Sequence, residues 1–316
     1  VLTKAIEAGG DAGKAATASL TNLKGDDVGT AIVKALSSDN KTVRATLLMI
    51  LADRSEKTAT PAVLAAAGSD KESTVRRAAF KALGTLAAQS DVEKMAAMLV
   101  AADSSSDKAG LANAILQVSE RCDDADKRSA PIIAAMGKAD DKTKSVLLVV
   151  LSRLAGDKAY AEIKSQLTAG SDDVKKASVR ALAAWPDATP AQTLLGVAKS
   201  DTDTARKILA MRGYIRVVTI PGKEAPTAAV CKAKTELLAK GLKVASGASE
   251  KKRILAALAS FPTTEGLAIV QGCVSDAALS VEAKLAISQI KWAMARTTAK
   301  VSASRGADQA ALAIDG

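Results

Sequence analysis

The side chains in this chain that could do chemistry are carboxylates, thiols and basic groups, because the sequence contains no histidine. Histidine is the most common general base and the most common metal ligand. Adjacent acids occur at Asp123-Asp124 and Asp140-Asp141, and paired carboxylates can act as acid and base when one of them is desolvated. Both pairs fall in predicted turns, where solvent surrounds both groups. Helix capping is therefore a better interpretation of these acids than catalysis.

The cysteines give no sign of a metal or redox site. Cys122, Cys231 and Cys273 lie far apart, and none belongs to a C-x-x-C pair, the close spacing by which such sites are recognised. The sequence also lacks a glycine-rich phosphate loop and a G-x-S-x-G motif. We therefore predict a protein that is not an enzyme and that has no cofactor and no metal, with its cysteines as small buried apolar residues.

The elements that must position the basic side chains follow from a repeat. An acidic turn, followed by an apolar helix with a basic residue near its start, recurs at roughly 30-residue intervals. In the clearest copy, Val75, Ala79, Leu83 and Leu86 have the spacing of a helix with one buried face. The other copies begin near Asp39, Asp107, Asp141, Asp172, Asp201, Glu250 and Asp276. Such a period predicts an all-α solenoid of helix pairs, A then B, each burying its apolar face on its neighbours.

The composition and the breaks in the repeat give the organisation of the chain. Aromatic residues make up only 2% of the sequence, so small side chains must form a core of closely packed helices. Trp185 and Phe261 each precede a proline at a helix end and are interpreted as packing residues. We predict a repeat array over residues 1–296, with its longest insertion at 218–227, and a C-terminal tail over 297–316. A binding loop and a lengthened connection are equally good interpretations of the insertion.

The acids of the turns are expected to cap the B helices. A Ser-Asp pair precedes several of these helices, and both side chains accept hydrogen bonds from the unpaired amides of a first helical turn. We expect capping to be the whole role of these acids, which are Asp70, Asp107, Asp172, Asp201 and Asp276.

Residues 75–84, Val-Arg-Arg-Ala-Ala-Phe-Lys-Ala-Leu-Gly, resemble the V-R-x-x-A-x-x-A-L-G core of bacterial HEAT repeats of the phycobilin-lyase type. Val43-Arg44 is a second match, and Val174-Lys175 keeps the pattern with lysine. The resemblance covers nearly the whole chain. It implies a right-handed α-solenoid of about eight to nine antiparallel helix pairs, with B helices lining its concave surface and an Asp–basic ladder along the stack. Lyase activity is not implied, because a repeat scaffold does not transfer function.

If B helices line the concave surface, the positions of Arg77 and Lys81 face a ligand. Counting along the repeats places Lys176, Arg180, Arg206 and Lys252 at equivalent positions, which we predict as binding residues. Between them the count gives Ala112/Leu116 and Ser145/Val149, pairs without a basic residue. A groove that follows phosphates needs basic residues in successive units and aromatics that stack bases. The interrupted stripe therefore favours a protein ligand and makes nucleic acid unlikely, although the net charge is +10.

The leading hypothesis is a scaffold that binds another protein or another copy of itself. The last predicted helix keeps Leu285, Ile287, Ile290 and Trp292, which predicts that the tail, a partner domain or a neighbouring subunit covers that end. The alternatives are an accessory module of a larger secreted protein and a nucleic-acid binder using the basic patches. Residues 212–287 are similar to HEAT segments of large secreted bacterial proteins, which implies an extracellular or periplasmic location. No apolar run has the length of a membrane span.

Overall fold

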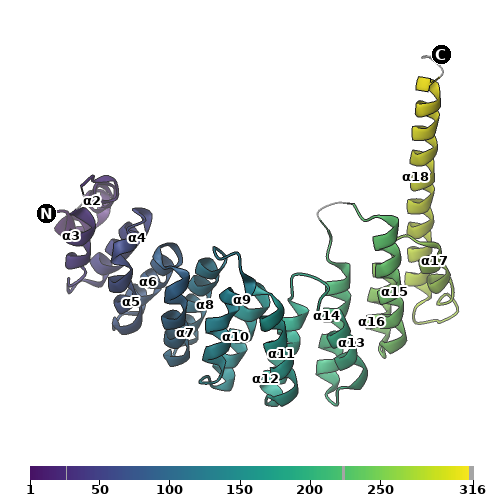
Figure 1. Cartoon of the computed structure of the whole chain (residues 1–316), viewed down its shortest axis with the longest axis horizontal. Helices are drawn as coiled ribbons and strands as arrows, with labels where there is room; N and C mark the ends of the chain where they lie inside the picture. Colours follow the sequence, from purple (N-terminus) through teal and green to yellow (C-terminus); the bar gives the residue numbers. More distant parts are fainter. Residues whose placement is uncertain (26, 223–224, 313–316) are drawn as a thin grey trace. The chain divides into compact units, whose positions relative to one another are not determined.

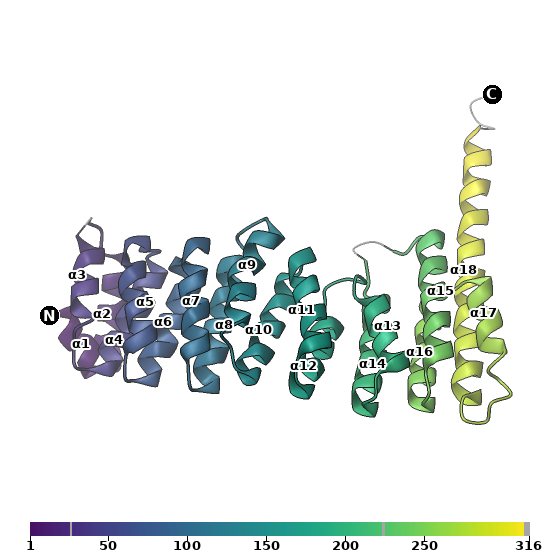
Figure 2. The same ribbon diagram turned by 60° about the horizontal axis from the view of Figure 1, so that its bottom comes forward.

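The computed structural model describes residues 1–25, 27–222 and 225–312, with side chains as far as Arg296. Its backbone is helical throughout, and the described residues include no strand. The chain divides into two compact units, unit 1 (Val1–Ala181) and unit 2 (Leu182–Gly316). Each unit is a row of helices that pack on their neighbours in chain order (Figures 1 and 2).

In unit 1, helices pair along the sequence, and the second helices of successive pairs, α4, α6, α8 and α10, pack on one another. We refer to these four helices, together with α12, which follows in the chain order, as B helices. The last of them, α12, contains the division between the units. The elements are α1 (Leu2–Ala8), α2 (Gly10–Asn22), α3 (Val28–Ala35), α4 (Lys41–Asp53), η1 (Lys57–Ala59), α5 (Thr60–Ser69), α6 (Ser73–Leu86), η2 (Gln89–Asp91), α7 (Val92–Ala101), α8 (Ser105–Ser119), α9 (Ala125–Met136), α10 (Asp141–Leu154), α11 (Asp157–Ala169) and α12 (Asp172–Ala183).

Unit 2 repeats the arrangement with the pairs α13–α14, α15–α16 and α17–α18. Its helices are α13 (Ala191–Ser200), α14 (Thr204–Thr219), α15 (Ala228–Val244), α16 (Ala248–Ala259), α17 (Thr264–Gln271) and α18 (Ser280–Leu312). The segment expected as an insertion at 218–227 joins α14 to α15, and residues 223 and 224 lie outside the described ones. Since α18 runs on to Leu312, the helix extends into the segment expected as a tail.

The predicted apolar stripes account for the packing. Val75, Ala79, Leu83 and Leu86 of α6 are all buried, and so are the corresponding residues of α4. Trp185 and Phe261 are buried as well, which confirms that they are packing residues. In α10, Val146 is only half-buried while Leu148 is buried. The prediction of an all-α array of consecutively packed helix pairs is therefore confirmed.

An ion-pair ladder, formed by Arg44–Asp70, Arg76–Asp107 and Lys108–Asp140, joins successive B-helix turns of unit 1. Arg44 donates through Nε to Asp70 Oδ2 at 2.7 Å and through Nη2 to Oδ1 at 3.0 Å. Its third nitrogen donates to the carbonyls of Ser38 and Asp39. The bidentate contact satisfies both charges where each side chain is only 11% exposed.

This ladder corrects the expectation that capping is the whole role of the turn acids. Asp70 accepts the amide of Glu72, but it also holds Arg44. Asp107 lies inside α8, whose N-cap is Ser104, and its carboxylate binds Arg76 at 2.8 Å. In unit 2, Asp201 binds Arg206 instead of capping α14, which is capped by Asp203. The N-caps of α6, α8 and α14 are therefore Glu72, Ser104 and Asp203, and not the Asp of the Ser-Asp pair.

A second set of arginines sits at the opposite helix ends. Each of three arginines lies at or just beyond the end of its own helix and donates to the last carbonyls of an earlier helix. Arg54 donates to α2, Arg121 to α6 and Arg216 to α12. Arg121, for example, donates to the carbonyls of Gly84 and Ala87 at 2.9 and 2.6 Å. The last carbonyls of a helix lack partners and carry the negative end of its dipole. These arginines therefore cap one helix from the next.

Candidate functional site

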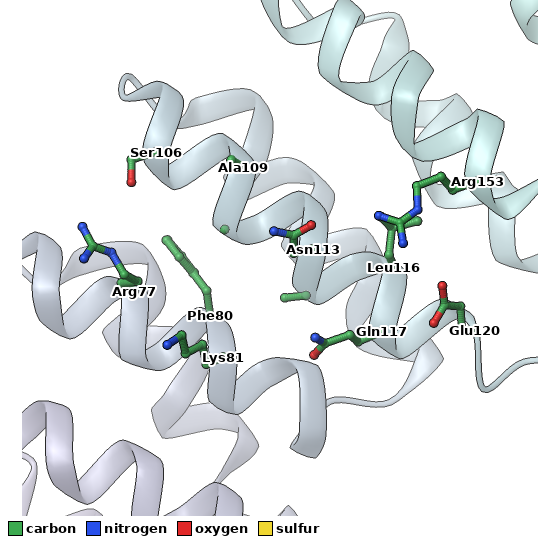
Figure 3. A pocket seen from close by; sticks show the side chains of 12 residues that line it. Arg77, Phe80, Lys81, Ser106, Ala109, Asn113, Leu116, Gln117, Glu120 and Arg153 are labelled. Carbon is green, nitrogen blue, oxygen red and sulfur yellow. The ribbon is translucent and has the colours of Figure 1, made fainter. Parts of the chain in front are cut away.

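Two adjoining cavities lie on the B helices of unit 1. The first, of about 460 Å³, lies on α6, α8 and α10 and is lined by Arg77, Phe80, Lys81, Ser106, Ala109, Gly110, Asn113, Ala114, Leu116, Gln117, Glu120 and Arg153 (Figure 3). The second, of about 360 Å³, lies on α8, α10 and α12 and is lined by Ala109, Ala112, Asn113, Leu116, Ser145, Val146, Val149, Val150, Arg153, Ala177 and Arg180. Because they share Ala109, Asn113, Leu116 and Arg153, we treat them as one surface, the B-helix groove.

The N-cap of each helix sets which side chains reach this groove. Arg77 and Lys81 are the fifth and ninth residues after Glu72, the cap of α6. Counting from Asp140, the cap of α10, the same positions are Ser145 and Val149, and Arg153 follows one turn later. In α12, the side chain of Ser171 accepts the amide of Val174, and the count from Ser171 gives Lys176 and Arg180. Four of the six predicted binding residues are therefore exposed on the B helices of unit 1.

The register of α8 differs from the one counted from the sequence. A count that starts at Asp107, in the Ser106-Asp107 pair, places Ala112 and Leu116 on the ligand-facing side. The helix is capped by Ser104, so the fifth and ninth residues are Ala109 and Asn113, and Gln117 follows one turn later. Ala112 is buried, whereas Asn113 and Gln117 are exposed. The middle of the groove is therefore polar where an apolar interruption was expected.

Arg206 has the same register problem and lies in unit 2, as does Lys252. The N-cap of α14 is Asp203 and not Asp201, which makes Arg206 the third residue after the cap. It is 7% exposed, and its Nε lies 3.0 Å from Asp201 Oδ2. We therefore assign Arg206 to the framework of unit 2. Lys252 is half-buried and its Nζ lies 2.9 Å from Glu282 Oε1.

The basic side chains around the groove differ from those of the ladder in having no acid to neutralise them. Within the part of the chain that the structure describes, none of Arg77, Lys81, Arg153, Lys176 and Arg180 forms an ion pair. Four of them line the groove, and Lys176 lies one turn before Arg180 on α12. Glu120 is the one carboxylate among the residues that line the two cavities. The groove therefore carries an excess of positive charge.

Apolar side chains form the floor of the groove. Phe80 and Leu116 are buried beneath it, while Val149, which lines the second cavity, is 50% exposed. The Phe80 ring lies against Gly110, where an added Cβ would come within 2.5 Å of the ring. Arg77 and Lys81 project from α6 and Arg153 from α10, with Asn113 and Gln117 of α8 between them (Figure 3). Such a mixture of apolar contact, amides and charge is typical of a binding surface.

Among the described residues, no group of three or more Cys, Asp or Glu side chains could bind a metal ion. Cys231 is buried and Cys122 and Cys273 are half-buried, and burial raises the pKa of the Cys231 and Cys273 thiols. A raised thiol pKa lowers the thiolate fraction and with it the nucleophilicity. Among the helices of the described ranges, none has the length and hydropathy that crossing a bilayer requires.

A second exposed apolar surface lies on α18 in unit 2. Val281, Leu285 and Trp292 point away from the packed side of the helix, and Trp292 is 62% exposed. Arg296 lies over the Trp292 ring at 4.5 Å from its centroid. Ile290, in contrast, is buried. One expectation from the sequence was that the C-terminal tail covers this end of the array. Because α18 continues as one helix to Leu312, residues 297–312 do not fold back over the stripe.

Comparisons with known proteins found similar solved structures but no curated relative. Similar solved structures include two engineered proteins, each 18% identical, with TM-scores of 0.30 and 0.31; the matches cover 92% and 83% of this chain and 98% and 96% of those chains. Human deoxyhypusine hydroxylase in complex with glycerol is 14% identical over 89% of this chain and 90% of its own, with a TM-score of 0.29. At these scores the structural similarities carry no argument about function.

The family comparison is more specific. Residues 29–116 match the family model for HEAT repeats. This range runs from α3 into α8 and contains the ladder arginines Arg44 and Arg76 together with Arg77 and Lys81 of the groove. Residues 29–116, the part of the chain that the family model matches, are therefore similar to HEAT repeats.

Proposed function

We propose that this chain is a non-enzymatic scaffold that binds another protein through the B-helix groove of unit 1. HEAT repeats generally act as protein-interaction scaffolds, and stacked repeats provide extended binding surfaces. The observation that carries the proposal is the continuity of the groove over α6, α8, α10 and α12, where two cavities share four of their lining residues.

The chemistry of the groove supports binding of a protein segment. Exposed amides at Asn113 and Gln117 can pair with the backbone of a bound chain. Val149 offers an apolar contact that a solvent-exposed helix surface does not need for folding. A bound segment that covers Val149 would remove this apolar surface from water, which is the main favourable term in protein association.

A peptide-display selection on the full chain tests this proposal. Peptides recovered from a random library would be titrated against the wild type and Val149→Asp. We expect Val149→Asp to weaken binding by about tenfold or more, since about 1.4 kcal/mol corresponds to a factor of ten. Val230→Asp is the matched control, because Val230 is 41% exposed on α15 of unit 2. Recovery of no peptide, or equal binding to both variants, would refute the proposal.

Self-association through α18 is a second candidate, favoured by the exposed stripe Val281, Leu285 and Trp292. A helix face of this kind gains stability when a second helix covers it. Light scattering after size exclusion would give a mass above that of one chain, and Leu285→Lys with Trp292→Lys would return it to one chain. A single-chain mass for the wild type at high concentration would exclude this candidate.

A further inference from the structure

Resting on the proposed function, we propose that the B-helix groove binds an extended acidic segment of its partner, with at least one apolar side chain between the acids. The groove lies entirely in unit 1, so the inference depends only on contacts within that unit. Its basis is the placement of the unpaired cations relative to the exposed apolar surface.

The unpaired cations stand at both ends of the groove and near its middle. Arg77 and Lys81 belong to α6, Arg153 to α10, and Lys176 with Arg180 to α12. Within the described residues these five side chains have no carboxylate partner. Arg44, Arg76 and Lys108, which lie on α4, α6 and α8, each have one. Bringing acids to these five positions would neutralise charges that folding leaves unpaired and would speed encounter through long-range attraction.

The apolar contact lies between the two basic ends. Val149, on α10, is flanked in the second cavity by Leu116, Val146 and Ala177. A leucine- or phenylalanine-sized side chain that sits here would be buried on Val149, and neighbouring acids could reach Arg153, one turn further along α10, and Arg180 of α12, which line the same cavity. This order of groups predicts the pattern acidic, apolar, acidic along the bound chain.

The dimensions of the groove favour an extended segment. Neighbouring packed helices lie about 8–10 Å apart, so the step from α6 to α12 through α8 and α10 covers about 24–30 Å. An extended chain advances about 3.3 Å per residue, so about eight or nine residues span this distance. A helix of that many residues would be only about half as long, at 1.5 Å per residue.

A nucleic acid fits the same surface less well. Bases bound without pairing are held by stacking on exposed aromatic rings. The aromatic residue of the groove is Phe80, which is only 3% exposed. Phosphates would meet the five cations, but the apolar surface at Val149 would have no partner on a sugar–phosphate backbone.

The test selects from an unbiased display library of peptides of about ten residues, the length that spans the groove. Sequenced selections on the wild type are expected to be enriched in Asp and Glu relative to the input library, with an apolar residue between the acids. Selections on Arg77→Glu/Lys81→Glu and on Lys176→Glu/Arg180→Glu should lose this enrichment. Lys94→Glu/Lys138→Glu is the matched control, because it reverses two exposed charges that line neither cavity.

Titration of a selected peptide separates the two proposals. Replacing its acids by the corresponding amides should weaken binding by about tenfold or more and should abolish most of the salt dependence. If the selected peptides carry no acidic excess but still depend on Val149, the groove is a peptide site and the acidic preference is wrong. If a single-stranded oligonucleotide of similar length binds more tightly than every selected peptide, the partner class is wrong. Failure to recover any peptide that depends on Val149 would refute the proposed function itself.

Discussion

The ion-pair ladder and the B-helix groove meet at two neighbouring residues of α6. Arg76 turns toward α8, where its Nη2 lies 2.8 Å from Asp107 Oδ2, and it also donates to the carbonyl of Asp70 at 2.8 Å. Arg77 turns into the groove and forms no ion pair among the described residues. The two side chains are identical in type, yet one holds repeats together and the other is available to a ligand.

The comparison shows that the role of a basic residue in this array depends on its count from the helix cap. Residues four positions after the cap, such as Arg44, Arg76 and Lys108, face the next turn and its acid. Residues five and nine positions after the cap face the groove, because a step of one residue rotates a side chain by about 100° around the helix. Net charge alone cannot distinguish the two sets.

Arg44→Ala should give the largest loss of stability and is the strongest test of this division. It leaves Asp70 largely buried without its bidentate partner, and removing one member of such a pair costs about 2–3 kcal/mol. Arg77→Ala removes an exposed side chain with no ion pair and should change stability by less than about 0.5 kcal/mol. Urea unfolding followed by circular dichroism measures both. Equal losses would show that the ladder and the groove are not energetically distinct.

Gly110→Ala should give the next largest effect, because it alters the boundary between the core and the groove. The new Cβ would lie 2.5 Å from Cδ2 of the buried Phe80 ring, and overpacking of this kind costs about 1–3 kcal/mol. At Gly84 the atom in the way is the Gln117 amide, which is exposed and can rotate. Gly84→Ala should therefore be neutral or stabilising by up to about 1 kcal/mol through helix propensity. Thermal unfolding of both variants tests the contrast, and a larger loss at Gly84 would contradict it.

The fold was predictable from the sequence because the repeat fixes which face of each helix is apolar. Val75, Ala79, Leu83 and Leu86 define that face, and each of them is buried as expected. Arg77, Lys81, Lys176 and Arg180 are exposed on helices whose register follows the acidic turn, capped at Glu72 and Ser171, and their binding role stays a prediction.

The remainder of the site could not be predicted because several residues compete for each cap. Ser104 and Ser106 both lie near the start of α8, and the choice of Ser104 as the cap makes Asn113 and Gln117 the exposed residues of the groove, with Ala112 and Leu116 buried in its floor. Arg206 was misplaced for the same reason. Arg153 was missed because it lies one turn beyond the positions that were counted, although its spacing from Val149 was a usable signal.

Acid should weaken the ladder while leaving the groove cations charged. The hydrogen bonds from Arg44 hold the pKa of the Asp70 carboxyl below its usual range. The ionised Asp70 therefore stabilises the fold fully above the ordinary aspartate pKa of about 4. This stabilisation is lost as the pH falls through the lower pKa that Asp70 has in the folded state. The loss should be smaller than that of Arg44→Ala, because a protonated Asp70 still accepts a hydrogen bond from Arg44.

Melting temperatures measured from about pH 7 to about pH 3 test this expectation. The difference in stability between the wild type and Arg44→Ala should shrink toward low pH, since both then lack an ionised Asp70 paired to arginine. Arg77→Ala is the control, and its curve should run parallel to that of the wild type. A constant difference between the wild type and Arg44→Ala over this range would mean that the Asp70 charge does not contribute to stability.

Lys252→Ala should have the smallest effect, and it separates pairing from burial. Lys252 has a partner at 2.9 Å, as the ladder residues do, but the side chains of Lys252 and Glu282 are 40% and 32% exposed. Solvent screens such a pair, whose contribution is about 0–1 kcal/mol. A loss within this range, measured by urea unfolding beside Arg44→Ala, would show that burial and not the presence of a carboxylate gives the ladder its strength. A loss as large as that of Arg44→Ala would show instead that an ion pair stabilises the fold whether or not it is buried. The lack of a carboxylate partner would then be enough to tell the groove cations from the structural ones.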